Sequence, residues 1–244
     1  MSASRSARAT ADGAAAGWAP GPAEPVLADA AVHVWRVDLR RVDDSVVESL
    51  SVAERARMAK LVSGRHRRLS SRSRGVLRQL LARYLRDDAH ALELTIGAQG
   101  KPELCGSRAG ARTLHFNLSH SRHLALYAFA VNGPVGVDVQ FTRDQRSARA
   151  TDYVALGRRS FGEHAARTLA ALDDESRERE FLRLWTRYEA ELKLLGVGIG
   201  AASSQRATGA AREPSIVELD VAPDAAAALA LDWRASALRQ WDWA

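Results

Sequence analysis

Cysteine, methionine and long apolar runs are scarce in this sequence. The 244 residues include one cysteine, Cys105, and two methionines. One cysteine cannot form an internal disulfide bond, which is typical of proteins in a reducing compartment. No stretch approaches the roughly 18 apolar residues of a membrane-spanning helix, and the N-terminus has no continuous apolar segment of the secretory type. The sequence therefore predicts a soluble, cytoplasmic protein without internal disulfide bonds.

The remaining composition is that of a globular protein with more basic than acidic residues. Hydrophobic residues make up 46% of the chain, enough to bury one large core or two small ones. The chain has 35 basic and 29 acidic residues, a formal net charge of +6 and a pI near 10.1. This balance favours anionic partners, although net charge governs association rather than fold.

The first half is predicted to begin with a disordered tail and to continue with a strand and two helices. Residues 1–25 are rich in Ala, Ser, Gly and Pro, so burial cannot offset the entropy cost of ordering them. The alternating stretch 31–39 predicts a strand. Ser51 and Glu54 have the spacing of a helix-capping box, and residues 65–86 have the apolar periodicity of an amphipathic helix.

Residues 65–86 also hold eight arginines, which admit two interpretations. Most of them are expected to form a solvated basic face. Arg74 and Arg78 lie four residues apart and therefore share an edge of the helix. For Arg74 the second interpretation, an anion site, has as much support as the first. Guanidinium groups match phosphate oxygens, and backbone N–H groups near a helix start attract anions.

Two later segments place polar residues next to expected turns. Lys101 and Pro102 end the loop GAQGKP, residues 97–102, where the proline disfavours helix. Residues 114–119 alternate between apolar and polar types, which predicts a strand with a polar face, followed by a Ser-His-Ser turn. His120 has an unperturbed pKa near neutrality, so it can bind phosphate or shuttle a proton, or it can simply cap the turn.

An aspartate inside a valine-rich strand is the most informative single residue. Residues 124–131 predict a buried strand, and the Asn-Gly pair after it predicts a hairpin, so that the strand 135–140 would return antiparallel beside it. On this second strand Asp138 shares a face with Gly136 and Gln140. Because aspartate is depleted in strands, Asp138 is either a buried structural carboxylate or a ligand of Mg²⁺, which prefers carboxylate oxygen.

The second half is predicted to contain two helices and two closing strands. One helix is expected around residues 159–172 and a clearer one over 174–195, with Gly196 in position to end it. Glu189 and Lys193 lie one turn apart beside the apolar stripe of the longer helix. Such a pair is usually a surface salt bridge, but here it is expected to point to the same cleft as the strand carboxylate. Two short strands and a tryptophan-rich tail follow.

Four short motifs succeed one another along the chain. They are GKP (100–102), FNLSHS (116–121), VGVDVQ (135–140) and WTRYEAELK (185–193). In this order and at these separations they resemble the motif series of the Sfp-type 4′-phosphopantetheinyl transferases. LSVAER (50–55) and the arginine-leucine helix after Arg74 are also similar to the first half of that family. The resemblance covers residues 32–221.

This resemblance implies an α+β fold with pseudo-twofold symmetry, in which two similar α/β halves enclose coenzyme A. We expect an N-terminal half over residues 26–133 with the coenzyme A-binding motifs, and a C-terminal half over residues 134–244 with the metal and catalytic motifs. Family members use Mg²⁺ to transfer the 4′-phosphopantetheine arm of coenzyme A to a serine of an acyl or peptidyl carrier domain, releasing adenosine 3′,5′-bisphosphate. The implied partners include no nucleic acid and no membrane, and the implied state is a monomer built as a pseudo-dimer.

The resemblance also assigns roles to individual residues. Metal ligands would be Asp138, Gln140 and Glu189. Catalysis would involve Glu189, Lys193 and His120, with Glu189 or a water that it orients removing the serine proton. Contacts to the coenzyme would come from six residues: Arg74, Lys101, Pro102, Ser119, His120 and Lys193. Carrier domains tend to be acidic, so basic residues are expected to help bind them.

Two residues depart from the family pattern. Gln140 stands where a second carboxylate is usual, and Tyr188 stands where a lysine usually precedes the glutamate. These departures keep open an alternative, a catalytically impaired family member that binds coenzyme A or a carrier domain. The pI and the arginine-rich helix motivate a second alternative, a nucleic-acid-binding module, although the sequence shows no motif of that kind.

Overall fold

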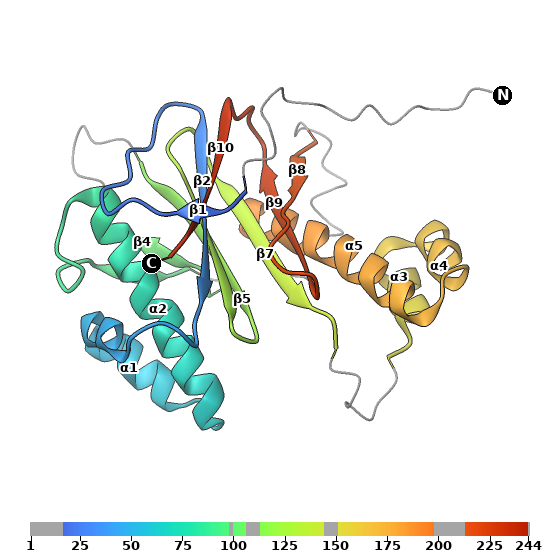
Figure 1. Cartoon of the computed structure of the whole chain (residues 1–244), viewed down its shortest axis with the longest axis horizontal. Helices are drawn as coiled ribbons and strands as arrows, with labels where there is room; N and C mark the ends of the chain where they lie inside the picture. Colours follow the sequence, from blue (N-terminus) through green and yellow to red (C-terminus); the bar gives the residue numbers. More distant parts are fainter. Residues whose placement is uncertain (1–16, 98–99, 106–112, 144–150, 198–212, 244) are drawn as a thin grey trace.

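Five strands form the larger sheet of the protein. The computed structural model describes residues 17–97, 100–105, 113–143, 151–197 and 213–243. The sheet has the order β1-β10-β2-β6-β5 (Figure 1). Its strands are β1 (Ala19–Pro20), β10 (Ala237–Asp242), β2 (Ala31–Asp38), β6 (Leu124–Ala130) and β5 (His115–Ser121). The strand predicted over residues 31–39 is confirmed as β2, and the tryptophan-rich tail forms β10, which pairs with β2 in parallel.

Part of the segment expected to be a disordered tail is anchored to this sheet. Residues 1–16 lie outside the described residues. Farther on, the Trp18 indole donates a hydrogen bond to the carbonyl of Asp220 at 2.5 Å, and the Arg36 guanidinium lies 4.5 Å from the Trp18 ring centroid. These contacts and the short strand β1 hold residues 17–25 in place, which composition alone did not indicate.

Helix α2 (Gly64–Leu85) packs its apolar face on the larger sheet. Val76, Leu77, Leu80 and Leu81 are fully buried in a cluster that includes the tryptophan and aromatic residues of β2 and β6. The amphipathic helix predicted over residues 65–86 is therefore confirmed. Before it come the 3₁₀ helix η1 (Asp44–Ser49) and helix α1 (Val52–Ala59), whose predicted capping box is present.

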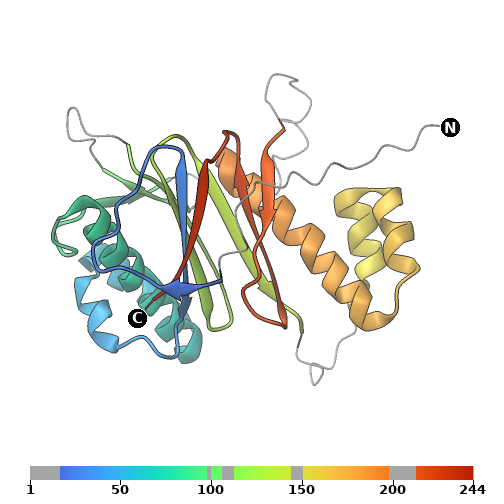
Figure 2. The same cartoon turned by 45° about the horizontal axis from the view of Figure 1, so that its top comes forward.

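The smaller sheet has the order β7-β9-β8 and is covered by helix α5 (Figure 2). Its strands are β7 (Val135–Phe141), β9 (Ala225–Leu231) and β8 (Ser215–Glu218), and α5 spans Asp174–Leu195. A side chain on Gly136 would clash with the carbonyl oxygen of Ala190, so this glycine lets α5 lie directly on β7. The long helix and its end at Gly196, where φ is 69°, are as predicted.

The predicted hairpin between β6 and β7 is wrong. β6 pairs with β2 and β5, whereas β7 pairs with β9. Side chains of β5 instead hold β7 in place: Asn117 Oδ1 accepts a hydrogen bond from the Val137 amide at 2.9 Å, and Ser119 Oγ donates to Asp138 Oδ1 at 2.7 Å. These buried polar groups replace a backbone ladder, which the Asn-Gly turn signal could not reveal.

Four shorter elements complete the described chain. Strands β3 (Leu94–Ile96) and β4 (Pro102–Leu104) form a hairpin. The single helix expected around residues 159–172 is instead two helices, α3 (Tyr153–Phe161) and α4 (Glu163–Ala170), because Gly162 with a φ of 85° breaks the run. The predicted α+β fold is confirmed. Among the described residues, no helix is long and apolar enough to cross a membrane.

Candidate active site

A lysine and an aspartate meet where α5 lies on β7. Lys193 Nζ is 2.7 Å from Asp138 Oδ1 and also donates to the Val137 carbonyl at 3.3 Å. Asp138 is only 1% exposed, so this cation balances a carboxylate that folding has removed from water. Asp138 and Lys193, predicted to share a cleft although 55 residues separate them in the sequence, are therefore in direct contact.

The same carboxylate receives further donors from the two strands. Ser119 Oγ donates to Oδ1 at 2.7 Å, and Gln140 Nε2 donates to Oδ2 at 3.4 Å. The Ser121 hydroxyl contacts Gln140 Oε1 at 3.5 Å, the outer limit of a hydrogen bond. Among the described residues, Asp138 Oδ1 thus has two short contacts, whereas Oδ2 has one long contact. Ser119, predicted as a coenzyme contact, is buried and directed to Asp138.

Glu189 is the second carboxylate of the site and differs from the first in its surroundings. It is half-buried. Burial raises the pKa of Glu189 above its ordinary value, the negative charge of Asp138 raises it further, and Lys193 acts in the opposite direction. Two carboxylates that repel each other in this way favour either a proton or a cation between them.

Glu189 and Lys193 line a cavity of about 300 Å³, called here the acid cavity. Its other walls include Arg74 from α2, Leu118 from β5, and Lys101 and Pro102 from the start of β4. Lys101 Nζ donates to the Lys193 carbonyl at 3.3 Å, and burial lowers the pKa of Lys101. The structure therefore brings the predicted residues of the GKP motif to the glutamate and the lysine of α5.

Arg74 lies in the middle of α2 rather than next to its start, so the predicted contribution of backbone N–H groups is wrong. The guanidinium of Arg74 is 3.6 Å from Glu54, which also pairs with the buried Arg78 at 3.0 Å. Arg74 Nη1 and Glu54 Oε1 are buried atoms without a hydrogen-bond partner among the described residues. Burial lowers the pKa of Arg74.

His120 lies within β5, so the Ser-His-Ser turn predicted after the strand is wrong. Its side chain points to the face of β5 opposite to that of Ser119, because successive strand residues alternate. There it lines a cavity of about 560 Å³, called here the histidine cavity, with Arg65, His66 and Arg122 among its other walls. Burial lowers the pKa of His120, and its electrostatic interactions with His66, Lys193 and Arg74 lower it further.

The two cavities lie one after the other between α2 and β5. His66 and Ser70 of α2 line the histidine cavity, and Arg74 lines the acid cavity. Sequence reasoning selected Arg74 and His120 but missed His66, whose ring centroid is 6.3 Å from that of His120. The signal was available: His66, Ser70 and Arg74 are four residues apart, so they share one edge of a helix.

Trp185 and Tyr188 of α5 lie close to each other and to Phe161 of α3. Their ring centroids are 6.1 Å apart, and Phe161 of α3 lies 6.4 Å from Trp185 and 5.8 Å from Tyr188. Trp185 thus packs α5 against α3, as expected of a residue that supports the site helix. Tyr188, which replaces the usual lysine, contributes to the same aromatic contact.

The similarity to known proteins agrees with this arrangement. The model of the 4′-phosphopantetheinyl transferase superfamily matches residues 134–240. The 4′-phosphopantetheinyl transferase HetI of Nostoc sp. is 34% identical over 185 residues, which cover 75% of this chain and 76% of HetI. The chain belongs to the 4′-phosphopantetheinyl transferase superfamily. The predicted family and enzyme class, a phosphopantetheinyl transferase, are thereby confirmed.

Other members of the superfamily match shorter parts of the chain. The putative 4′-phosphopantetheinyl transferase slr0495 of Synechocystis sp. is 36% identical over 53% of this chain and 50% of its own length. The 4′-phosphopantetheinyl transferase AcpT of Salmonella typhimurium is 38% identical over 43% of this chain and 50% of its own length. Against these two relatives the chain spans about half of their length.

Proposed function

We propose that this chain transfers the 4′-phosphopantetheine arm of coenzyme A to a serine of an acyl or peptidyl carrier domain. The reaction would need Mg²⁺ and would release adenosine 3′,5′-bisphosphate. The observation that carries the proposal is the meeting of Asp138, Glu189 and Lys193 beside cavities that Arg74 and His120 line. The names of the relatives support the same group transfer.

The donor set at this site suits a magnesium ion. No group of three or more His, Cys, Asp or Glu side chains within the described ranges could hold a metal. Mg²⁺ does not require one, because it commonly binds through one or two carboxylates and completes its coordination with waters and substrate phosphates. Asp138 and Glu189 would supply these carboxylates and Gln140 an amide oxygen. The raised pKa of Glu189 beside Asp138 shows a repulsion that a divalent cation would relieve.

The basic residues would position the coenzyme. In the histidine cavity, Arg65, His66 and His120 offer donors to a phosphate monoester, while Arg74, Lys101 and Lys193 surround the acid cavity. We assign the 3′-phosphate to His120 and the pyrophosphate to the acid cavity, with Pro102 shaping its wall. The bound phosphates would also raise the pKa of His120, because negative charge favours the imidazolium form.

The reaction then needs one proton acceptor and a stabilised leaving group. The serine oxygen attacks the phosphorus next to pantetheine, and the bond from that phosphorus to the oxygen of the departing bisphosphate breaks. Glu189, or a water that it orients, would accept the serine proton. Lys193 opposes the charge that grows on the bisphosphate. When bound, Mg²⁺ supplies charge neutralisation for the pyrophosphate and holds it in line for attack.

The test is to incubate the full chain with coenzyme A, Mg²⁺ and an apo carrier domain, and to measure the intact mass of the carrier. The expected result is the added mass of one phosphopantetheine, lost when the metal is chelated and in Asp138→Asn. Retained binding of coenzyme A without any transfer, across several acyl and peptidyl carriers, would instead identify a coenzyme-binding protein.

A further inference from the structure

Glu54 of α1 is a buried carboxylate that the proposed reaction does not use. It is 8% exposed and lines neither the acid cavity nor the histidine cavity. A buried carboxylate costs free energy unless cations and hydrogen-bond donors compensate it. Two arginines of α2 pair with Glu54, namely Arg74 and Arg78, which are one helical turn apart. The contacts of the two carboxylate oxygens distinguish the roles of these arginines.

The Oε2 atom of Glu54 is used by the fold. It accepts a hydrogen bond from the Ser51 amide at 3.0 Å, which belongs to the capping box of α1. It accepts another from Arg78 Nη1 at 3.0 Å. Arg78 is 1% exposed and also donates to the carbonyls of Ala89 and Leu92. This oxygen therefore connects α1, α2 and the segment after α2, and the role of Arg78 is structural.

The Oε1 atom of Glu54 has different surroundings. It forms an ion pair with Arg74, whose Nε lies 3.6 Å away, beyond the distance of a hydrogen bond. Oε1 and Arg74 Nη1 are buried atoms without a hydrogen-bond partner among the described residues. Buried polar atoms without partners cost free energy, so each of them needs an explanation. The cap of α1 does not provide one, because Oε2 alone accepts the Ser51 amide.

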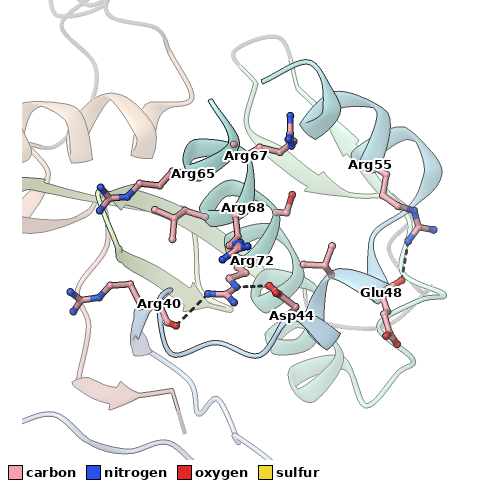
Figure 3. Close-up of a pocket in the computed structure, with 12 residues that line it drawn as sticks. Arg40, Asp44, Glu48, Arg55, Arg65, Arg67, Arg68 and Arg72 are labelled. Carbon is pink, nitrogen blue, oxygen red and sulfur yellow. Dashed lines mark hydrogen bonds and ion pairs between the residues drawn. The ribbon is translucent and has the colours of Figure 1, made fainter. Parts of the chain in front are cut away.

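Arg72, two residues before Arg74 on α2, shows how the same helix anchors an arginine completely. The side chains of Arg72 and Arg74 are 12% and 13% exposed, and each pairs with a carboxylate. Arg72 donates to Asp44 at 2.7 Å in a cavity of about 1070 Å³ (Figure 3). It also donates to the Leu39 carbonyl at 2.8 Å. Within the described ranges the contact of Arg74 with Glu54 is an ion pair without a hydrogen bond. The two arginines are buried alike, but Arg74 keeps donors that the fold does not use.

Arg74 is surrounded by other cations. It lines the acid cavity together with Lys101 and Lys193. Burial lowers the pKa of Arg74, the negative charge of Glu54 raises it, and the positive charge of Arg57 lowers it again. Neighbouring cations repel a guanidinium more strongly in a buried position than in water. Glu54 therefore stabilises the charge of Arg74 at the wall of the acid cavity.

We infer that Glu54 is a positioning residue for the coenzyme and that it acts through Arg74. The carboxylate holds the guanidinium charged at the acid cavity, while the 3.6 Å contact leaves guanidinium donors for a phosphate oxygen of the ligand. Hydrogen bonds between guanidinium groups and phosphate oxygens are charge-assisted and therefore strong. This inference rests on the proposed function, because it takes the pyrophosphate of coenzyme A as the group that Arg74 binds.

The experiment replaces Glu54 by glutamine, which keeps the size of the side chain and an oxygen for Ser51 and Arg78 but removes the charge. We expect the Kd of coenzyme A, measured by calorimetry with the full chain and Mg²⁺, to rise about 10-fold, because Arg74 is no longer held. KM for coenzyme A should rise by the same factor, whereas kcat at saturating coenzyme A should stay within about twofold, since Glu54 contacts no reacting group.

Ser51→Ala is the matched control for the cap. Ser51 Oγ accepts a hydrogen bond from the Glu54 amide at 3.2 Å, so this variant breaks the same capping box but leaves the carboxylate in place. It should lower the stability to urea without changing the Kd of coenzyme A. A rise in Kd equal to that of Glu54→Gln would overturn the inference, because loss of the cap alone would then explain it.

A double-mutant cycle separates positioning from a general effect on the fold. Arg74→Met should raise the Kd of coenzyme A by about 10-fold or more. In the Arg74→Met protein, Glu54→Gln should add nothing, because its effect passes through the missing guanidinium. An additive rise in Kd would overturn the inference, and so would an unchanged Kd in Glu54→Gln alone.

Glu54→Asp decides the question if Glu54→Gln does not fold. It keeps the negative charge that Arg78 needs but withdraws the carboxylate from Arg74 by one methylene. We expect the Kd of coenzyme A to rise about 3-fold or more, and an unchanged Kd would overturn the inference. An unchanged Kd in these variants, with normal transfer by the native protein, overturns the positioning role alone. Absence of transfer by the native protein overturns the proposed function, whatever the Kd values.

Discussion

Helix α2 borders two regions that concentrate charge in different ways. Beside its middle, the buried charges are paired: Lys193 with Asp138 at 2.7 Å and Arg78 with Glu54 at 3.0 Å. Beside its N-terminal part, Arg65 and Arg68 are exposed and unpaired among the described residues. Water can solvate an exposed charge, but a buried charge without a partner destabilises the fold. The first region therefore holds its charged groups in fixed positions, whereas the second leaves its charges to be solvated by water.

The largest expected effect is at the centre of the paired region. Asp138→Asn keeps the size of the side chain and its contact with Ser119 but removes the charge that Lys193 balances. We expect the rate of arm transfer to fall by about 10³-fold, because a proposed metal ligand and the counter-charge of Lys193 are lost together. The measurement is the initial rate of carrier modification, with Ser119→Ala as the control.

Ser119→Ala removes only one hydrogen bond from Asp138 and should cost about 10-fold or less. If Asp138→Asn retained the native rate, the region around Lys193 and Asp138 would have no catalytic role. Its contrast with the exposed arginines at the N-terminal part of α2 would then fail.

The sequence correctly predicted the elements whose positions depend on local residue patterns. Periodicity located α2 and α5, and the alternation on β7 correctly placed Asp138 and Gln140 on the face of Gly136, where α5 packs. Prediction from the sequence failed where contacts between distant residues determine how strands pair. The Asn-Gly turn after β6 is a genuine local signal, but the side chains of Asn117 and Ser119 hold β7 against β5 without a backbone ladder.

The candidate site shows the same division. The resemblance selected Glu189 and Lys193, and the structure brings both to one cavity with Arg74 and Lys101. Nothing in the sequence indicated that Lys193 occupies an oxygen of a predicted metal ligand, because that contact depends on how closely α5 approaches β7. His66 was missed because the arginines of this helix dominate its pattern, although His66, Ser70 and Arg74 share the edge that lines the two cavities beside β5.

The buried His33 tests the statement that a buried charge without a partner destabilises the fold. His33 is 3% exposed, and its Nδ1 lies 2.9 Å from the Tyr84 hydroxyl. Burial, and to a lesser degree the positive charge of Arg239, lower the pKa of His33 from 6.5 to about 4. The fold thus favours neutral imidazole. The unfolded chain binds the proton more tightly, so this contribution to stability is complete above pH 6.5 and is lost as the pH falls towards 4.

Between pH 7 and pH 5 this linkage predicts a loss of about 2 kcal/mol in the free energy of unfolding. The measurement is urea unfolding at both pH values for the native protein and for His33→Gln, which cannot titrate. The difference between the two proteins isolates the histidine, because their other titrating groups are the same. Equal pH dependence in both would show that His33 has an ordinary pKa.

A smaller effect is expected at Lys193, which contacts the carboxylate of Asp138. Lys193 Nζ lies 2.7 Å from Asp138 Oδ1, so it competes with any cation for that oxygen. In Lys193→Met we expect Mg²⁺ to bind about 10-fold more tightly in the absence of coenzyme A, although arm transfer should be impaired. Calorimetric titration with Mg²⁺ alone measures this, with Lys101→Met as the control, since Lys101 donates its hydrogen bond to the Lys193 carbonyl and, among the described residues, none to Asp138. Weaker Mg²⁺ binding in Lys193→Met would contradict the competition.

The smallest expected effect concerns the number of carboxylates around Asp138. Gln140 stands beside Asp138, and its amide Nε2 donates to Asp138 Oδ2 at 3.4 Å. Gln140→Glu replaces that donor with a third carboxylate, which attracts a divalent cation more strongly but repels Asp138 until the cation arrives. We expect half-saturation of transfer activity at a Mg²⁺ concentration several-fold below that of the native protein. Gln140→Asn, which keeps the amide, should not lower it. An unchanged half-saturation in Gln140→Glu would mean that residue 140 faces the carboxylates without contributing to metal affinity, and the metal ligands would then be Asp138 and Glu189 alone.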